Sequence, residues 1–311
     1  MNKKNSIIIL ASLFFLFILC MLFIKKDSSH QTDKPFILCT TGIIGDTIQR
    51  IVGGTAHVHS LMGPWIYPHL YKAREGDVHR LANADIIFYN GLHLEGKMAH
   101  ALEQMNRYTP SIALSDVLPV DSLLQTEVGG IYDPHIWHDV TLWIKIVEYA
   151  TSCLCKRWPE NSKLYATNSQ KLCEELRTLD AYIRKQIATI DSKKRILITA
   201  HDAFSYFGKR YGMEVVGLQG VSTDAEISTS AIQELVDYLV EHQIHAIFVE
   251  SSIPKRSIQA VHDAATARNW YIIIGDELYS DALGDADSGA HSYGAMIRSN
   301  VDAIVHALTT T

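Results

Sequence analysis

The alternation of short apolar runs with amphipathic stretches, which begins near Lys34, most constrains the fold of this chain of 311 residues. Short apolar runs indicate buried strands and the stretches between them indicate helices, a pattern typical of βα units with parallel strands. The runs form two sets of four: Phe36–Thr40, Val58–Met62, Ile86–Asn90 and Ser111–Leu114, then Arg195–Ala200, Met213–Leu218, Ala246–Glu250 and Tyr271–Gly275. We therefore expect an α/β protein with two lobes, each with a mainly parallel four-stranded sheet flanked by helices.

A longer helical stretch separates the two sets of strands. Between Pro159 and Ser192, leucine and isoleucine recur at steps of three and four residues, the period of one helix face. This face comprises Leu172, Leu176, Leu179, Ile183, Ile187 and Ile190. Pro159 suits the first turn of a helix. We expect one spine helix of more than 30 residues between the lobes, although a core helix of a single lobe is the alternative.

The other expected helices lie between the strands of each set. They are Gly76–Asn83, Lys97–Asn106, Val140–Trp158, Thr229–His242, Lys255–Asn269 and Tyr293–Leu308. Together with the spine, they predict four segments along the chain. These are an N-terminal signal anchor (1–33), an N-terminal α/β lobe (34–158), a linking helix (159–193) and a C-terminal α/β lobe (194–311).

The N-terminus carries an unbroken apolar run from Ser6 to Ile24, with lysines at both ends. A helix of this length spans roughly 28 Å, close to the hydrocarbon core of a bilayer, which is about 30 Å thick. A cleaved secretory signal usually has a shorter apolar region and a small-residue cleavage site, and none is evident here. Leu19 precedes Cys20 where a lipid-modified cysteine would follow a small residue. We expect an uncleaved anchor that holds an exported domain at the membrane, with cleavage left open.

Charge and cysteine content exclude some classes of function. Beyond residue 26 the chain carries 24 basic and 34 acidic side chains, a formal charge of −10. This acidic body argues against nucleic acid as a partner. The five cysteines form no C-x-x-C pair, so we expect buried or partly buried structural thiols rather than a metal site or a disulfide framework.

Four of the potential metal-ligating residues stand out by their position. The chain has fifteen histidines, so most of them must be bystanders. In open α/β sheets, ligands bind beyond the carboxyl ends of the strands. His69, His201 and Asp281 each follow an expected strand. His135 precedes an expected helix, but it directly follows a proline, as His69 does.

These four residues have the chemistry of a metal cage. A proline before each of two histidines restricts the backbone and so lowers the entropy cost of presenting a ligand. Aromatic neighbours, Trp65, Tyr67, Tyr71 and Trp137, are expected to keep the surroundings dry. Three imidazoles and one carboxylate suit a divalent transition metal such as zinc, with two ligands from each lobe. The wide spacing of 66, 66 and 80 residues leaves open whether the four form one site or have separate structural roles.

Other histidines have simpler interpretations. His57 and His59 alternate on one strand and so share a face, which we expect to be solvated or to lie between the lobes. His93 follows a strand and could line the mouth of the cleft. His291 lies in a loop rich in glycine and serine and is expected to be exposed. Two more residues are candidate ligands. His138 is expected to form a hydrogen bond with a neighbour, and Glu250, at the end of an expected strand, is the best substitute if Asp281 is not a ligand.

From about Phe36 to Leu308, the sequence resembles the zinc/manganese solute-binding family of ABC transporters, the TroA-like periplasmic metal-binding proteins. The segments that carry the resemblance are "MGPWIYPHLYKAREGDVHRLANADIIFYNGLHLEGKM", "DPHIWHDVTLW", "HDAFSYFGKRYGMEVVGLQGVSTDAEIS", "IFVESS" and "ELYSDALGDADS", in this order. The resemblance implies two α/β lobes joined by one long helix. It also implies that the metal ligands are His69, His135, His201 and Asp281.

Details of the resemblance bear on the choice of metal. The third ligand in this family is histidine or glutamate, and glutamate is more typical of manganese-preferring members, so His201 favours zinc or dual use. The insertion rich in histidine and acid that many dedicated zinc carriers contain is absent from this chain. Trp65, Ile66 and Tyr67 stand where the family more often has small or acidic residues. The N-terminal anchor also departs from the lipoprotein form common among relatives.

The resemblance implies an extracytoplasmic solute-binding protein that captures Zn²⁺ or Mn²⁺ and delivers it to an ABC permease and its ATPase. We expect a monomer, no catalytic cofactor and no enzymatic activity, with small cleft changes on metal binding. A surface adhesin with a structural metal is one alternative. A zinc hydrolase is another, but its metal usually has three protein ligands and an open position for water, whereas four ligands are expected here.

Overall fold

The computed structural model describes residues 34–126, 130–222 and 227–310. The anchor expected at Ser6–Ile24 lies outside this range. Within the described residues, no helix has both the length and the apolar character that crossing a membrane requires. Residues Pro35–Thr311 form one compact unit, so the division into two lobes at the expected boundaries stays a prediction.

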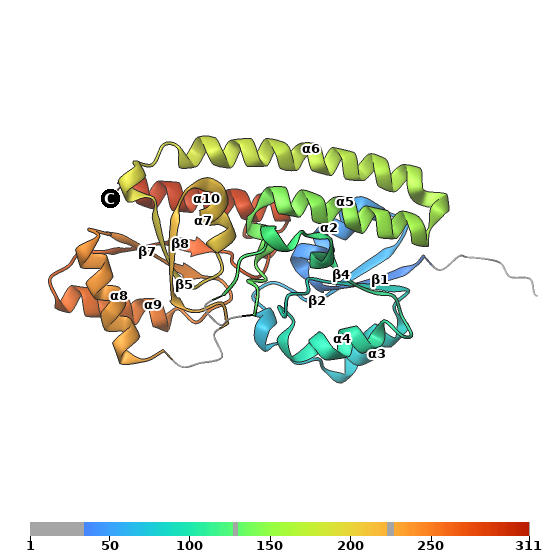
Figure 1. Ribbon diagram of the computed structural model, residues 1–311, viewed down its shortest axis with the longest axis horizontal. Coiled ribbons are helices and arrows are strands. Elements are labelled where there is room, and N and C mark those ends of the chain that lie inside the picture. The colour runs from blue at the N-terminus through green and yellow to red at the C-terminus, as the bar shows by residue number, and fades with distance from the viewer. Residues whose placement is uncertain (1–33, 127–129, 223–226, 311) are drawn as a thin grey trace, which may run out of the picture. The chain divides into compact units, whose positions relative to one another are not determined.

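The first half of this unit contains a parallel sheet with the strand order β2-β1-β3-β4. Its strands are β1 (Phe36–Thr41), β2 (His57–Met62), β3 (Ile86–Tyr89) and β4 (Ser111–Ala113), and its helices are α2 (Gly42–Val52), α3 (Glu75–Asn83), α4 (Ala99–Met105) and α5 (Val140–Arg157). Figure 1 shows α3 and α4 on one face of the sheet, with α2 and α5 on the other. The central strands β1 and β3 are therefore covered on both faces, which explains their almost wholly buried side chains.

The second half also has four parallel strands, but they are hydrogen-bonded as two pairs, β5–β6 and β7–β8. The strands are β5 (Ile196–His201), β6 (Glu214–Gln219), β7 (Ala246–Glu250) and β8 (Ile273–Leu278), and the helices are α7 (Ser205–Tyr211), α8 (Thr229–Glu241), α9 (Arg256–Ala267) and α10 (Tyr293–Thr310). Strand β5 lies beside β7. The expected α/β architecture with parallel strands and flanking helices is confirmed, whereas the single second sheet is replaced by two adjacent pairs.

Strand β8 lies further along the chain than the sequence predicts. The apolar run suggests Tyr271–Gly275, but the side chain of Tyr271 is 77% exposed and the strand begins at Ile273. Pairing with β7 then continues past the polar residues Asp276 and Glu277 to Leu278. Backbone hydrogen bonding to β7 determines where this strand ends, whereas the hydropathy of its residues does not.

The spine is helix α6 (Ser162–Ile187), whose 26 residues make it shorter than expected. A separate 3₁₀ turn, Pro159–Asn161, precedes it. All six residues of the predicted apolar face are buried. Figure 1 shows α6 running alongside both α5 and α10, which belong to different halves. One apolar cluster accordingly extends from Ile37 through α6 to Leu308, so both halves share a core.

The described cysteines fit the expected structural role. Cys39 and Cys173 are buried, Cys153 and Cys155 are partly buried, and all four are free thiols. Burial raises the pKa of the Cys39 thiol, which therefore stays protonated and unreactive. The fifth cysteine, Cys20, lies outside the described residues.

Candidate metal site

The structure brings together the four residues that the sequence singles out. His69 lies in a 3₁₀ turn, Pro68–Leu70, that follows β2, and His135 directly precedes another such turn. His201 is the last residue of β5, and Asp281 follows shortly after β8. One ligand atom from each lies within 4.8 Å of the others, and all four side chains are buried. Two come from each half, as predicted.

The distances between their ligand atoms fit a metal ion. The Nε2 atoms of His69 and His135 are 3.2 Å apart. The carboxylate of Asp281 places Oδ1 at 3.3 Å from His135 Nε2 and Oδ2 at 3.4 Å from His201 Nε2. Bonds of about 2.0–2.1 Å to a tetrahedral zinc ion separate neighbouring ligand atoms by about 3.3 Å. Among the described residues, His201 Nε2 and Asp281 Oδ1 are buried without a hydrogen-bond partner. A cation bound between them would coordinate both atoms.

A carboxylate two residues before His135 fixes the orientation of its ring. Asp133 Oδ1 accepts a hydrogen bond of 2.9 Å from the backbone N–H of His135, a turn that aspartate favours. The same oxygen lies 2.7 Å from His135 Nδ1. The carboxylate therefore holds a proton on Nδ1 and makes Nε2 the nitrogen that faces the cluster, as is usual for metal-bound histidine.

Hydrogen bonds from surrounding elements also hold the backbone around His135. Asn90 Nδ2, which follows β3, donates to Pro134 O at 2.9 Å. Two buried tyrosines of the second half reach the same segment: Tyr206 donates to Asp133 O at 2.9 Å, and Tyr293 donates to Trp137 O at 2.7 Å. Both halves thus position this turn before any metal binds.

Glu250 of β7 contacts both the backbone and the ring of His201. Its Oε1 accepts from the backbone N–H of His201 at 2.9 Å, and its Oε2 lies 2.6 Å from His201 Nδ1. Glu250 is not a member of the four-residue cluster. Glu250 was expected as a substitute ligand only if Asp281 failed; Asp281 lies in the cluster, and Glu250 contacts His201 at Nδ1, the ring nitrogen other than the Nε2 that faces Asp281.

His69 is held mainly by packing. Its ring centroid is 5.0 Å from that of Tyr67, whose ring also meets His201 edge-on at 5.9 Å. The backbone of Gly96, with φ +22°, approaches so closely that an added Cβ would lie 2.6 Å from His69 O. In the part of the chain that the structure describes, His69 has no carboxylate within ion-pairing distance.

The three imidazoles consequently differ in their affinity for protons. Burial, together with the nearby His135, lowers the pKa of His69 to about 3. Burial also opposes protonation of His135, but the carboxylates of Asp133 and Asp281 outweigh it and raise this pKa to about 9. Burial is likewise outweighed at His201, where Glu250 and Asp281 raise the pKa well above its usual value. The same ion pairs hold the pKa of Asp281 well below its usual range despite its burial.

The aromatic residues expected around the site divide into two groups. Trp137 is buried with its ring edge-on to His135 at 5.3 Å, and Tyr67 packs on two of the histidines. The other two do not enclose the cluster. Trp65 is 44% exposed, and the hydroxyl of Tyr71 donates to Asp77 Oδ2 at 2.6 Å.

The remaining histidine candidates lie elsewhere or act indirectly. His57, His59, His93 and His291 are exposed. His138 is buried and donates from Nε2 to Ser280 O at 3.1 Å, which confirms the expected bond to a neighbour. Trp137 Nε1 donates to the same carbonyl at 2.8 Å. These two bonds join the turn after His135 to the residue before Asp281.

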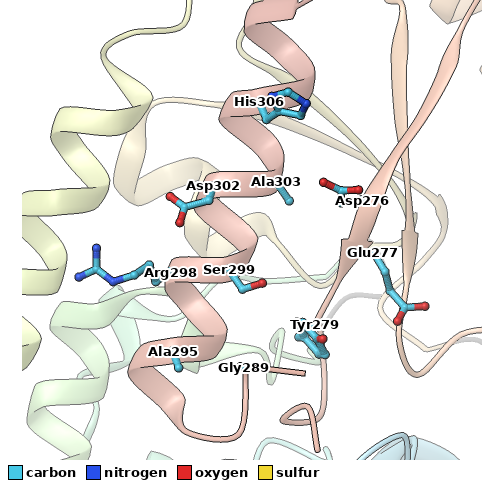
Figure 2. A pocket seen from close by; sticks show the side chains of 10 residues that line it. All are labelled: Asp276, Glu277, Tyr279, Gly289, Ala295, Arg298, Ser299, Asp302, Ala303 and His306. Carbon is cyan, nitrogen blue, oxygen red and sulfur yellow. The ribbon is translucent and has the colours of Figure 1, made fainter. Parts of the chain in front are cut away.

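A separate open groove of about 700 Å³ lies between β8 and α10, and Figure 2 shows its lining side chains. It includes Glu277 and Tyr279 from the segment of β8 and Arg298 and Asp302 from α10. None of the four cluster residues lines it. The groove is therefore adjacent to the segment that carries Asp281 without being part of the cluster.

Similar proteins are found both by sequence and by structure. Residues 37–307 match the family described as ZnuA, zinc-uptake complex component A periplasmic. The zinc-binding protein TroA of Treponema pallidum is 43% identical over 91% of this chain and 92% of its own length. The manganese-binding lipoprotein MntA of Bacillus subtilis is 42% identical over 88% of this chain and 89% of its own.

Solved structures give the same picture. The periplasmic zinc-binding protein TroA from Treponema pallidum superposes with a TM-score of 0.86 at 43% identity, over 88% of this chain and 99% of that one. Fe(III)-bound YtgA from Chlamydia trachomatis gives 0.79 at 26% identity, over 88% and 98%. This chain belongs to the ZnuA family, whose members are substrate-binding proteins of ABC transporters rather than enzymes.

Proposed function

We propose that this protein captures Zn²⁺ or Mn²⁺ outside the cytoplasmic membrane and delivers it to an ABC permease driven by its ATPase. The observation that carries the proposal is the buried convergence of three imidazoles and one carboxylate. The ligands are His69, His135, His201 and Asp281. Two carboxylates outside the set already orient two of the rings, so little rearrangement is needed on binding.

The donor set favours zinc in equilibrium binding. Three nitrogen donors suit zinc, whereas manganese prefers oxygen ligands and binds more weakly at nearly any such site. Relatives are named for zinc, for manganese and for iron, so family membership alone does not select one metal. We propose that zinc binds more tightly, and that manganese is carried when it is the more available ion.

We also propose that the body of the protein acts at the outer face of the cytoplasmic membrane. Several relatives are lipoproteins by name, which supports an extracytoplasmic protein held at a membrane. We propose that the apolar segment Ser6–Ile24 anchors this chain and that the body acts as a monomer. Accessibility of the body to protease added outside intact cells, with and without that segment, tests the arrangement.

Metal analysis tests the binding site. The full-length protein is equilibrated with equal Zn²⁺ and Mn²⁺, separated from free metal, and assayed for both ions. One zinc ion per chain is expected in the wild type, and His201→Ala and Asp281→Ala should each sharply weaken its retention. The matched control is His291→Ala, because His291 is an exposed histidine outside the cluster. Undiminished zinc in both cluster variants would refute the site.

A second experiment tests delivery. Cells that depend on this protein for metal uptake should lose accumulation of radioactive zinc when it carries Asp281→Ala, and keep it with His291→Ala. Equal uptake by both strains would contradict a transport role even if binding were intact.

A further inference from the structure

Trp65 has a backbone conformation that a large side chain rarely adopts. Its φ is +66°, in the left-handed region where a side chain other than glycine is strained. Trp65 lies four residues before His69, in the segment between β2 and the turn that carries this histidine. Such strain persists only where surrounding contacts hold it, so a stabilising contact is expected for this side chain.

That contact reaches the other half of the molecule. The indole of Trp65 lies against the ring of Tyr279, with centroids 6.2 Å apart and planes at 43°. This separation is within the range in which aromatic pairs attract each other. Tyr279 lies two residues before Asp281. One ring pair therefore connects the segment of His69 with the segment of Asp281.

Tyr279 is a fixed partner in this pair. Its side chain is 8% exposed, and Asn300 of α10 holds its backbone through two hydrogen bonds, both of 2.8 Å. Figure 2 shows Tyr279 at one end of the groove between β8 and α10. Trp65, in contrast, is 44% exposed. The side of the pair that can move is therefore the segment of Trp65 and His69.

Several kinds of contact hold this segment in place. The backbone N–H of Ile66 reaches Gly63 O at 3.4 Å, a long hydrogen bond within the segment itself. Packing of Tyr67 against two histidine rings adds a second contact across the halves. The ring pair with Tyr279 is thus one of the contacts that connect the segment of His69 with the second half.

We propose that Trp65 is a positioning residue that keeps His69 within reach of the metal by docking on Tyr279, and so sets the rate of metal release. The inference rests on the proposed function and deepens it. Withdrawal of His69 requires the ring pair to separate, and the strained backbone relaxes as this occurs. Without the indole, His69 leaves the ion more often and release accelerates, while the other three ligands stay in place.

Stopped-flow kinetics test this role in the full-length protein loaded with Zn²⁺ alone. Excess chelator traps the released ion, and the dissociation rate is measured for Trp65→Ala, Tyr279→Leu, the double variant and Trp65→Phe. Loss of an aromatic pair should accelerate release about two- to tenfold. The double variant should match the single ones, because both changes remove the same contact. Trp65→Phe, which keeps a ring, should restore most of the slow release.

The control is Tyr108→Ala, since Tyr108 is an aromatic side chain of the same half that is 86% exposed; it should release zinc at the wild-type rate. The absorption spectrum of Co²⁺-loaded variants should keep the wild-type shape, because the bound ion retains all four ligands. Wild-type release from Trp65→Ala, or additive effects in the double variant, would overturn the proposal. A wild-type protein that binds no zinc would instead refute the proposed function.

Discussion

The two Pro-His turns begin alike and are supported in different ways. In one, Asp133 precedes the proline, and its carboxylate bonds both the backbone and the ring of His135. In the other, Tyr67 occupies the same place, and its ring packs against His69 with the two planes tilted by 35°. A carboxylate acts through directional bonds that fix ring and tautomer, whereas ring packing permits sliding.

This difference indicates that the two arms of the site have different tasks. His135 has a raised pKa and a backbone tied to both halves, so it stays in position with or without metal. His69 has a lowered pKa, and the ring of Tyr67 packs against it where a carboxylate supports His135, so its position depends on a contact that can separate. The proposed function requires that the protein bind its ion tightly and still release it, and one fixed arm with one releasable arm would meet both requirements.

The largest expected effect comes from removing each histidine in turn. His135→Ala should weaken zinc binding by more than the roughly 100-fold that loss of an outer partner can cause. His69→Ala should weaken it less, because the preset part of the site survives. Chelator competition measures both affinities. An equal or greater loss for His69→Ala would remove the distinction between the arms.

Asp133→Ala should have the next largest effect. Without its carboxylate, the His135 ring loses its orientation and its proton is no longer held on Nδ1. Zinc affinity should fall about 10- to 100-fold, the range found for partners of metal-bound histidines. The control is Asp285→Ala, another aspartate that accepts a hydrogen bond from a backbone N–H two to three residues later, but at an exposed site. An unchanged affinity in Asp133→Ala would show that packing alone suffices.

The affinity should also depend on pH through His135. Its pKa is about 9 without metal, so at neutral pH a bound ion must displace this proton. Zinc affinity should therefore rise with pH up to about pH 9, by about tenfold per pH unit through His135 and further through His201, whose pKa is also raised. His69, with a pKa of about 3, is already neutral and adds nothing to this slope. Calorimetry in buffers of different ionisation enthalpy measures the protons released, and no release at pH 7 would contradict the assignment.

The metal-free protein should show the opposite trend in stability. The pKa of His135 is raised from 6.5 to about 9 in the folded state, so its contribution is complete below pH 6.5. The free energy of unfolding of the metal-free protein should decrease as the pH rises from 6.5 to about 9. Urea titrations across this range measure it, and a flat profile would argue against the buried pair with Asp133.

The smallest expected effect is that of Tyr206→Phe. It removes the hydroxyl that donates to Asp133 O and accepts from the backbone N–H of Leu124, and should lower the free energy of unfolding by about 1–2 kcal/mol, typical of two neutral hydrogen bonds. Tyr271→Phe, at a site 77% exposed, is the control. A larger loss of metal affinity than of stability would show that this bond positions His135 as well as stabilising the fold.

Much of the fold is predictable because alternation of apolar and amphipathic segments reflects burial in a parallel sheet. The buried face of α6 was readable residue by residue from its period. Helices α2 and α7, which were not among the expected helices, begin within a few residues of the preceding strand, so the apolar runs merge. The late end of β8 depends on pairing with β7, which hydropathy does not encode.

The four cluster residues are predictable from their position after strands and from the repeated Pro-His step. Their partners are harder to predict. Asp133 has a local signal, since aspartate two residues before histidine can form a turn with it. Glu250 has no local signal, because it reaches His201 only after β5 and β7 come to lie side by side. Tyr206 and Tyr293 also have no local signal, because they contact the His135 segment from positions far away in the sequence.

The apolar cluster that runs through α6 has a consequence for how such carriers can diversify. Because both halves complete their interiors against the same helix, a chimera that joins the first half of this chain to the second half of a relative must inherit a compatible α6 face. Recombination within the family is therefore expected to exchange α6 together with the helices that pack on it from both halves.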